Sequence, residues 1–561
     1  MKLAAIAIAI LFVINVAAQD RKNSGETVFI NGNIWTGVAD GKRAQGLLVR
    51  HGRIAAVGTN DEVQAQKSKD AQIVDLGGKF VMPGFNDAHL HFASGGQTKL
   101  QVDLAGTKSL EEMKARIAER VKTAQPGEWI LGRGWDQTKW TKEVLPSRRD
   151  IDEVTAGHPA FFGRADGHIG VANSAALKAA GITRESKAPE GGQIDRDANG
   201  EPTGILRESA MDAVGGKIPP PTAAQRRRAI ELAMQEAAQF GITSVQDNSD
   251  WEDFLVYEEL EREGKLTLRI TEWLPFGAEM NVLQQRRARH AQTDPMLHTG
   301  LLKGYMDGSL GSSTAVLLEP YADDPKNKGL AQFKQADLNR MSDERAEAGF
   351  QFGFHAIGDG GAQMALDAFA EAERYVRERS TQKPNAPKRD FRFRVEHAQV
   401  IAPDQFAQFK KLGVIASMQP NHLLTDMFWA EQRVGPERAK YSYAWREFLK
   451  HGVPLAFGTD YPVEPITPFR GVYAAVTRKS EDGKRTYYPE QKLTIDEALA
   501  AYTAGAAYAE FAEKYKGTLN PGMVADFVML DRDLTKVEPE EILGTKVLRT
   551  VVGGKTVYPK K

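Results

Sequence analysis

The sequence predicts an α/β protein whose main body is a (β/α)8 barrel of the TIM type, with a small β-sandwich domain built from both chain ends and an inserted α/β subdomain. Three observations predict this fold. Buried-looking apolar runs alternate with helical patterns through residues 80–510, as expected for parallel strands with crossover helices. Short strands with glycine turns occupy both ends of the chain. A long stretch, about 100–238, separates the first two barrel strands.

Residues 1–18 have the pattern of a secretory signal peptide. Lys2 precedes an apolar run, and Ala17 and Ala18 supply the small residues of a cleavage site. A membrane anchor is the alternative, but the apolar run is shorter than the ~20 residues that span a bilayer. We therefore expect cleavage near Ala18, export to the periplasm or the medium, and no stable membrane insertion afterwards.

Residues 26–79 and 515–561 are expected to form one β domain. The first segment contains VFINGNIWTG and GLLVRHGRIAAVG, and the second segment contains GMVADFVMLDRD and VLRTVVGGKTVY. Such β-branched runs, divided by Asn-Gly, His-Gly and Gly-Gly turns, are typical of antiparallel hairpins. Chain termini often lie close together, so we expect the two segments to pair.

Eight apolar runs within residues 80–510 supply the barrel strands, and helical patterns such as AAQRRRAIELAMQEAAQF separate several of them. The runs are FVMPGFNDAHLHF (80–92), GITSVQD (241–247), LTLRITEWLP (266–275), LLKGYMDG (301–308), FQFGFHAIGD (350–359), FRFRVEHAQV (391–400), VIASMQP (414–420) and PLAFGTDYPV (454–463). The stretch 100–238 has strand-like pieces of its own and a Gly/Asp/Pro-rich loop. We expect it to be an inserted subdomain.

Charge and composition exclude several classes of protein. The 561 residues include 73 Lys and Arg against 74 Asp and Glu, with no basic stripe, so binding to nucleic acid is not expected. The chain has no cysteine, which excludes disulfides, thiolate zinc sites, iron–sulfur clusters and thiol nucleophiles. Metal chemistry therefore depends on His, Asp, Glu and Lys. A homo-oligomer is compatible with this composition.

Several metal-ligating side chains fall at the predicted carboxyl ends of barrel strands. His89 and His91 end the first strand, and side chains two residues apart on a strand point the same way, so both imidazoles can hold one metal. Lys303 lies in the fourth strand, where an ammonium would be poorly solvated. The other candidates are His355, His397 and Asp460. Each alone is more often a core polar group, but together they share the rim where barrel chemistry gathers.

These residues and the motifs around them resemble the binuclear-metal amidohydrolase superfamily, in their order and in their strand assignment. The sequence motifs around these residues are similar to those of its family-3 branch, which includes N-substituted formamide deformylase-like enzymes. The motifs are PGFNDAHLHF, GWDQTKW, RADGHIGVANSAAL, GEPTGILRE, YMDGSLGS, HAIGDGGAQMAL, RVEHAQ, SMQPNH, GTDYPVEP and GTLNPGMVADFVMLDRD. The resemblance extends from about residue 27 to the C-terminus.

The resemblance implies a metal-dependent hydrolase barrel with two divalent cations, most simply Zn2+, with Mn2+, Fe2+ or Co2+ as alternatives. It implies that a carbamylated Lys303 bridges the two ions and that Asp460 acts as general base and then general acid toward a metal-activated hydroxide. The implied metal ligands are His89, His91 and Asp460 on the more buried ion and His355 and His397 on the other. The substrate is then a small molecule with an amide or other non-peptide C–N bond.

The same metal core leaves other reactions open. Hydrolysis of a peptide-like or cyclic amide and deamination are alternatives, because fold and metal ligands do not choose the substrate. A non-catalytic metal-binding or scaffold protein is a more distant alternative. Such a protein usually shows lost ligands, whereas all the candidate ligands are present here.

Four further residues are candidates for substrate contacts. His168 and Asn173 lie in RADGHIGVANS of the insertion, where a capped turn is the alternative explanation. Trp135, in GRGWD, and His422, after the seventh strand, lie where loops can reach a substrate.

Overall fold

The computed structural model describes residues 25–38, 43–164, 169–189, 192–311, 313–380 and 389–560. It divides the chain into two compact units: Ala93–Ala233, and the two segments that flank it in sequence. The predicted signal peptide, residues 1–18, lies outside the described residues. Within the described ranges, no helix is both long enough and apolar enough to cross a bilayer.

Eight parallel strands form the barrel, and their order in the sheet is their order in the chain. They are β8 (Phe85–Leu90), β15 (Ile242–Asp247), β16 (Arg269–Pro275), β17 (Leu297–Tyr305), β18 (Phe352–Ala356), β19 (Arg394–His397), β20 (Ile415–Met418) and β21 (Leu455–Phe457). The first and last strands meet just beyond β21. There Asp460 N donates to His89 O at 2.8 Å, and His91 N donates to Tyr461 O at 2.7 Å. The predicted (β/α)8 architecture is confirmed.

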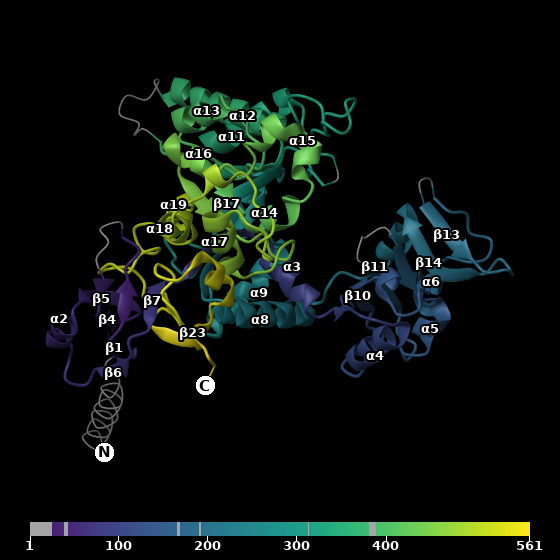
Figure 1. Cartoon of the computed structure of the whole chain (residues 1–561), viewed down its shortest axis with the longest axis horizontal. Coiled ribbons are helices and arrows are strands. Elements are labelled where there is room, and N and C mark those ends of the chain that lie inside the picture. Colours follow the sequence, from purple (N-terminus) through teal and green to yellow (C-terminus); the bar gives the residue numbers. More distant parts are fainter. Residues whose placement is uncertain are drawn as a thin grey trace, which may run out of the picture. The chain divides into compact units, whose positions relative to one another are not determined.

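Helices connect the barrel strands, three more follow the last strand, and most of them are labelled in Figure 1. In the helix that follows β18, the buried residues include Ala362, Ala365, Phe369 and Ala372, whose spacing of three and four places them on one apolar face. The helices are α8 (Ala223–Gln239), α9 (Trp251–Arg262), α10 (Met280–Arg287), α11 (Gln335–Glu347), α12 (Asp359–Ser380), α13 (Gln405–Leu412), α14 (Asn421–Asp426), α15 (Ala430–Ala439), α16 (Trp445–Lys450), α17 (Pro468–Thr477), α18 (Ile495–Ala500) and α19 (Ala506–Ala509).

Two sheets form a β sandwich, and the larger of them combines strands from both chain ends. The four-stranded sheet has the order β5 (Arg53–Gly58), β4 (Gly46–Arg50), β1 (Glu26–Ile30), β6 (Gln72–Asp75). The six-stranded sheet has the order β24 (Lys555–Tyr558), β23 (Val547–Val552), β22 (Phe527–Leu530), β7 (Phe80–Pro83), β2 (Asn33–Trp35), β3 (Arg43–Ala44). Phe29 and Phe527 meet in the core with ring centroids 4.9 Å apart, so side chains from both ends of the chain share one core.

The run 80–92, expected as one barrel strand, is two strands in different sheets. β7 pairs with β22 and β2 in the sandwich, whereas β8 pairs with β15 in the barrel. The chain changes sheets at Gly84, where a Cβ would lie 2.2 Å from the Thr243 side chain, so the close approach requires glycine. Hydrophobicity alone could not show this break, because both strands are buried throughout.

The unit Ala93–Ala233 has a six-stranded sheet of its own. Its order is β13 (Gly192–Arg196), β14 (Pro202–Glu208), β12 (Ile169–Ala172), β11 (Ala160–Arg164), β10 (Ile130–Trp135), β9 (Val102–Asp103). The helices α4 (Leu110–Val121), α5 (Arg148–Asp152) and α6 (Ser174–Ala179) accompany this sheet (Figure 1). The described part of this unit is therefore an α/β subdomain with its own core.

Candidate metal centre

The carboxyl ends of the barrel strands bring the predicted ligands into one cluster. His89 is in β8, Lys303 in β17, His355 in β18 and His397 at the end of β19, whereas Asp460 follows β21. The ring centroid of His397 lies 4.7 Å from that of His89 and 4.4 Å from that of His355. Lys303 Nζ lies 3.4 Å from His89 Nε2. Residues more than 350 positions apart in the chain therefore line one small volume.

One carboxylate oxygen, Asp460 Oδ1, faces two imidazole nitrogens. It lies 3.4 Å from Nε2 of His89 and 3.4 Å from Nε2 of His91. A tetrahedral ion with ligand bonds of about 2.0–2.1 Å requires ligand atoms roughly 3.3–3.4 Å apart. Asp460 Oδ1 is buried and makes no hydrogen bond to any described residue. Both distances are therefore compatible with a divalent cation beside Asp460 Oδ1.

Hydrogen bonds orient both of these histidines. His89 Nδ1 donates to Glu396 Oε2 at 2.8 Å, and Arg394 Nε donates to Glu396 Oε1 at 2.7 Å. His91 Nδ1 donates to the backbone carbonyl of Asn248 at 3.1 Å. Because a carboxylate and a carbonyl only accept, each ring keeps its lone pair on Nε2, where a metal can bind.

His397 and His355 supply a second pair of nitrogens. His397 Nδ1 is buried and has no hydrogen-bond partner among the described residues. His355 Nε2 donates to the carbonyl of Gly308 at 3.0 Å, which leaves the lone pair on Nδ1. Donor atoms of His89, His397 and Asp460 all lie within 4.8 Å of one another. The cluster therefore offers more donors than a single tetrahedral ion needs.

Two of these residues have an unusual backbone conformation. His397 has φ 74° and Asp460 has φ 59°, a region that costs a non-glycine residue on the order of 1–3 kcal/mol and is concentrated at functional sites. Asp87 holds the segment before Asp460 in place, because its carboxylate accepts from Thr459 N at 2.9 Å and from Thr459 Oγ1 at 2.6 Å. These hydrogen bonds thus hold the strained segment from which Asp460 enters the cluster.

Electrostatics keep the donors in their ligand forms. Burial lowers the pKa of His89 to about 4 and that of His355 to about 3, and the nearby ammonium of Lys303 adds to both shifts. Burial also lowers the pKa of His397 well below its usual value. Burial alone would raise the pKa of Asp460, but the surrounding imidazoles outweigh it and hold that pKa low. Neutral imidazoles and an ionised carboxylate are the forms that bind metal.

Lys303 is an amine enclosed by the barrel. It is 3% exposed, its Nζ lies 5.4 Å from the ring centroid of Trp273 and 5.1 Å from that of Tyr305, and it has no ion-pair partner among the described residues. Burial lowers its pKa to about 8. A solvated surface lysine has neither property, which makes Lys303 a candidate for a function at the cluster.

His422, predicted as a substrate contact, reaches the cluster by another route. It lies in the first turn of α14, the helix after β20, and its Nε2 donates to Asp460 Oδ2 at 3.0 Å. Residues that the sequence analysis missed also lie here, namely the Arg394 and Glu396 pair and Tyr305. Tyr305 OH accepts from Asn248 Nδ2 at 2.7 Å. Opposite charges two residues apart in the short strand β19 were the available signal for the pair.

The other candidate substrate contacts belong to the inserted subdomain. Trp135 is fully buried there, and its Nε1 donates to the carbonyl of Phe162 at 2.9 Å. Asn173 caps α6, accepting from Ala176 N and Ala160 N, and its amide donates to Thr155 Oγ1 and His158 O. The subdomain's own packing and hydrogen bonding thus account for both residues. His168 lies outside the described residues.

Comparison with known proteins agrees with the cluster's chemistry. The profile described as "Amidohydrolase family" matches residues 72–558. The chain belongs to the amidohydrolase family. As an amidohydrolase it is 35% identical to Protein LONG AFTER FAR-RED 3 of Arabidopsis thaliana, covering 94% of this chain and 91% of that protein. It is 28% identical to N-substituted formamide deformylase of Arthrobacter pascens, covering 95% and 98%.

A solved structure shares the fold of this amidohydrolase. It is an uncharacterized metal-dependent hydrolase from Pyrococcus horikoshii OT3, with a TM-score of 0.75 and 31% sequence identity, covering 92% of this chain and 99% of that one. The predicted superfamily is confirmed, and the protein is a metal-dependent amidohydrolase that uses a divalent cation.

Proposed function

We propose that this amidohydrolase cleaves a non-peptide C–N bond of a small amide, with N-substituted formamides as the leading substrate class. The proposal rests on Asp460 Oδ1, which lies 3.4 Å from Nε2 of both His89 and His91. A bound cation and the carboxylate base would therefore lie next to each other. The formamide class is supported by the similarity to the Arthrobacter pascens deformylase over 95% of this chain.

The donors divide into two groups, each suited to one divalent ion. Imidazole nitrogens and carboxylate-type oxygens suit Zn2+, with Mn2+, Fe2+ or Co2+ as alternatives. We assign His89, His91 and Asp460 to one ion, His355 and His397 to a second, and Lys303 to a position between them. The lone pairs left on His89 Nε2 and His91 Nε2 by their partners support the first group.

Asp460 moves the proton in this proposal. When bound, the cations lower the pKa of water toward neutrality and polarise the amide carbonyl. Asp460 accepts the proton that the attacking water loses as its oxygen bonds to the carbonyl carbon, and His422 Nε2, 3.0 Å from Oδ2, holds the carboxylate in position. As the C–N bond breaks, Asp460 returns the proton to the amine nitrogen. A formamide would yield formate and an amine.

Lys303 is proposed to become a carbamate. Its neutral amine nitrogen adds to the carbon of CO2, one N–C bond forms and one proton leaves, so the product carries a negative charge on oxygen. Burial lowers the pKa of Lys303 to about 8, which raises the neutral fraction that this addition needs. An anionic oxygen donor at this position would also balance two cations in a buried site.

Amine release tests the proposed reaction. Protein reconstituted with Zn2+ or Mn2+ is incubated with N-substituted formamides, N-acyl amino acids, dipeptides and cyclic amides, with chelated protein and Asp460→Asn as controls. We expect amine from formamides, and a decrease of at least about 100-fold in the variant, since positioned proton transfer contributes 10²–10⁴-fold. Turnover of another panel member with none of the formamides would exclude the formamide class. No turnover of any member would refute the amidase assignment.

A further inference from the structure

Three further metal-type ligands meet on the barrel at the end opposite the catalytic cluster. Donor atoms of Glu261, His290 and Asp294 all lie within 4.8 Å of one another. Glu261 is in the last turn of α9, whereas His290 and Asp294 are in the connection between α10 and β17. This connection enters β17 at its amino end, and Lys303 lies near the carboxyl end of the same strand. At about 3.3 Å per strand residue the two sites are on the order of 20 Å apart.

The imidazole of His290 is oriented with one nitrogen free. Its Nε2 lies 2.9 Å from Glu258 Oε1, and Arg289 donates to both oxygens of Glu258 at 2.5 and 2.6 Å. Because the carboxylate only accepts, the ring hydrogen lies on Nε2, and the neutral ring has its lone pair on Nδ1. The same carboxylate-and-arginine arrangement orients His89 in the catalytic cluster, and such partners are typical of metal-binding histidines.

Both carboxylates lie close to this imidazole. Asp294 Oδ1 accepts from Met296 N at 2.8 Å, and its Oδ2 lies 3.7 Å from His290 Nδ1. Glu261 makes no side-chain hydrogen bond or ion pair with any described residue, and its side chain is half-buried. Two carboxylates this close repel each other, and a bound cation would relieve the repulsion.

We propose that Glu261, His290 and Asp294 bind one divalent transition-metal ion, of the Zn2+ type, at a site separate from the catalytic centre. One nitrogen and two carboxylate oxygens suit Zn2+, with water as the fourth ligand. The ion ties the end of α9 to the connection before β17.

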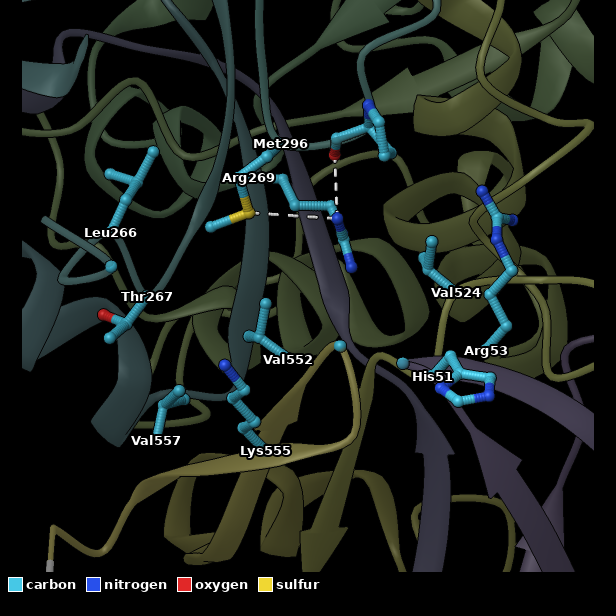
Figure 2. Close-up of a pocket in the computed structure, with 14 residues that line it drawn as sticks. His51, Arg53, Leu266, Thr267, Arg269, Met296, Val524, Val552, Lys555 and Val557 are labelled. Atoms are coloured by element: carbon cyan, nitrogen blue, oxygen red, sulfur yellow. Dashed lines mark hydrogen bonds between the residues drawn. The ribbon is translucent and has the colours of Figure 1, made fainter. Parts of the chain in front are cut away.

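The bound ion would hold together two segments that line the cavity in Figure 2. The cavity, with a volume of about 300 Å3, is lined by Gly264 and Leu266 directly after α9 and by Pro295 and Met296 directly after Asp294. Lys555 and Arg53 of the β domain line the same cavity. The ion would therefore stabilise the barrel where it meets the sandwich, which predicts an effect on stability and none on hydrolysis.

Metal counting on the full-length chain tests the proposal. Wild-type protein, His290→Ala and Glu261→Gln are dialysed against the same free Zn2+ concentration, and the metal per chain is measured by mass spectrometry. His451→Ala is the matched control, because this exposed histidine contacts the carbonyl of Glu447 in its own helix. We expect wild type and the control to bind one more Zn2+ per chain than the two site variants.

Thermal unfolding and hydrolysis complete the test. Added Zn2+ should raise the melting temperature of wild type and of His451→Ala more than that of His290→Ala, because an ion bound only by the folded state stabilises it. Hydrolysis by metal-loaded His290→Ala should stay within about twofold of wild type. Equal metal content in all four proteins would overturn the proposal. Loss of hydrolysis together with the extra ion would also overturn it, since the ion would then belong to the catalytic centre.

Discussion

Glu396→Gln is the most informative single change at the candidate metal centre. The glutamine keeps the size of the side chain and an oxygen that can accept from His89 Nδ1, but it removes the charge that Arg394 pairs with at 2.7 Å. We expect weaker metal binding without direct loss of a ligand. Since Arg394 would remain buried with less compensation, we also expect the free energy of unfolding to fall by about 3 kcal/mol, the lower end for breaking a buried ion pair.

The pKa of Glu396 indicates how much metal affinity the substitution removes. Burial alone would raise this pKa, but Arg394, His89 and Lys303 outweigh burial and lower it from 4.5 to about 2. At about 1.4 kcal/mol per pKa unit, the surroundings favour the carboxylate by about 3 kcal/mol. If about a third to a half of this free energy acts through His89, the substitution lowers metal affinity roughly tenfold. Losses between about 10-fold and 100-fold are typical when the hydrogen-bond partner of a metal-binding histidine is changed.

The assay is Zn2+ competition against a chromophoric chelator, combined with denaturant unfolding of metal-free protein. Glu513→Gln is the matched control, because Glu513 pairs with Arg392 at 2.8 Å and 31% of its side chain is exposed. The control should keep wild-type metal affinity. Wild-type affinity in Glu396→Gln, measured on folded protein, would refute the argument that this carboxylate prepares His89 for the metal.

Three further predictions address the rest of the chain. Lys303→Ala should lose most bound metal and activity, with partial return when a short carboxylic acid is added; full activity without it would show that something else bridges the ions. Glu510, buried against Lys516 at 2.8 Å, has a pKa below its usual 4.5, because the ammonium and its hydrogen bonds outweigh burial. Glu510→Gln should cost about 3 kcal/mol of unfolding free energy at pH 7. Because the folded-state pKa is depressed, this difference should persist above about pH 4.5 and shrink as the pH falls through the lower value; a pH-independent difference would contradict the pairing. Mass spectrometry of the exported protein should find Gln19 at the N-terminus, and an intact Met1 would contradict cleavage.

Local pattern was sufficient for the barrel strands and for placing several candidate metal ligands on one rim. Each strand run was apolar over a short window, and His89, His355 and His397 lie in or at the end of such runs, so their common location followed from the rule that parallel strands end on one rim. The break at Gly84 was not predictable in this way. Both sides of it are equally buried, and only the approach to Thr243 shows where the chain leaves one sheet for the other.

Hydrogen-bond geometry was beyond the reach of sequence patterns. Trp135 and Asn173 were reasonable pocket candidates by motif, but their polar atoms are engaged inside the inserted subdomain. Conversely, no motif assigns a role to Glu396, yet its Oε2 lies 2.8 Å from His89 Nδ1. Such assignments depend on which side chains meet from distant parts of the chain, and that information is absent from any local window.

The amino-acid order alone established the class of chemistry. Residue type decides which metals a side chain can bind, and the spacing of residues along a strand decides which way their side chains point, and both are local properties. The folded chain alone established which nitrogen of each histidine is free, that Asp460 Oδ1 lies between His89 and His91, and that His422 orients this carboxylate. Those facts are distances between residues hundreds of positions apart, and they exist only once the barrel has closed.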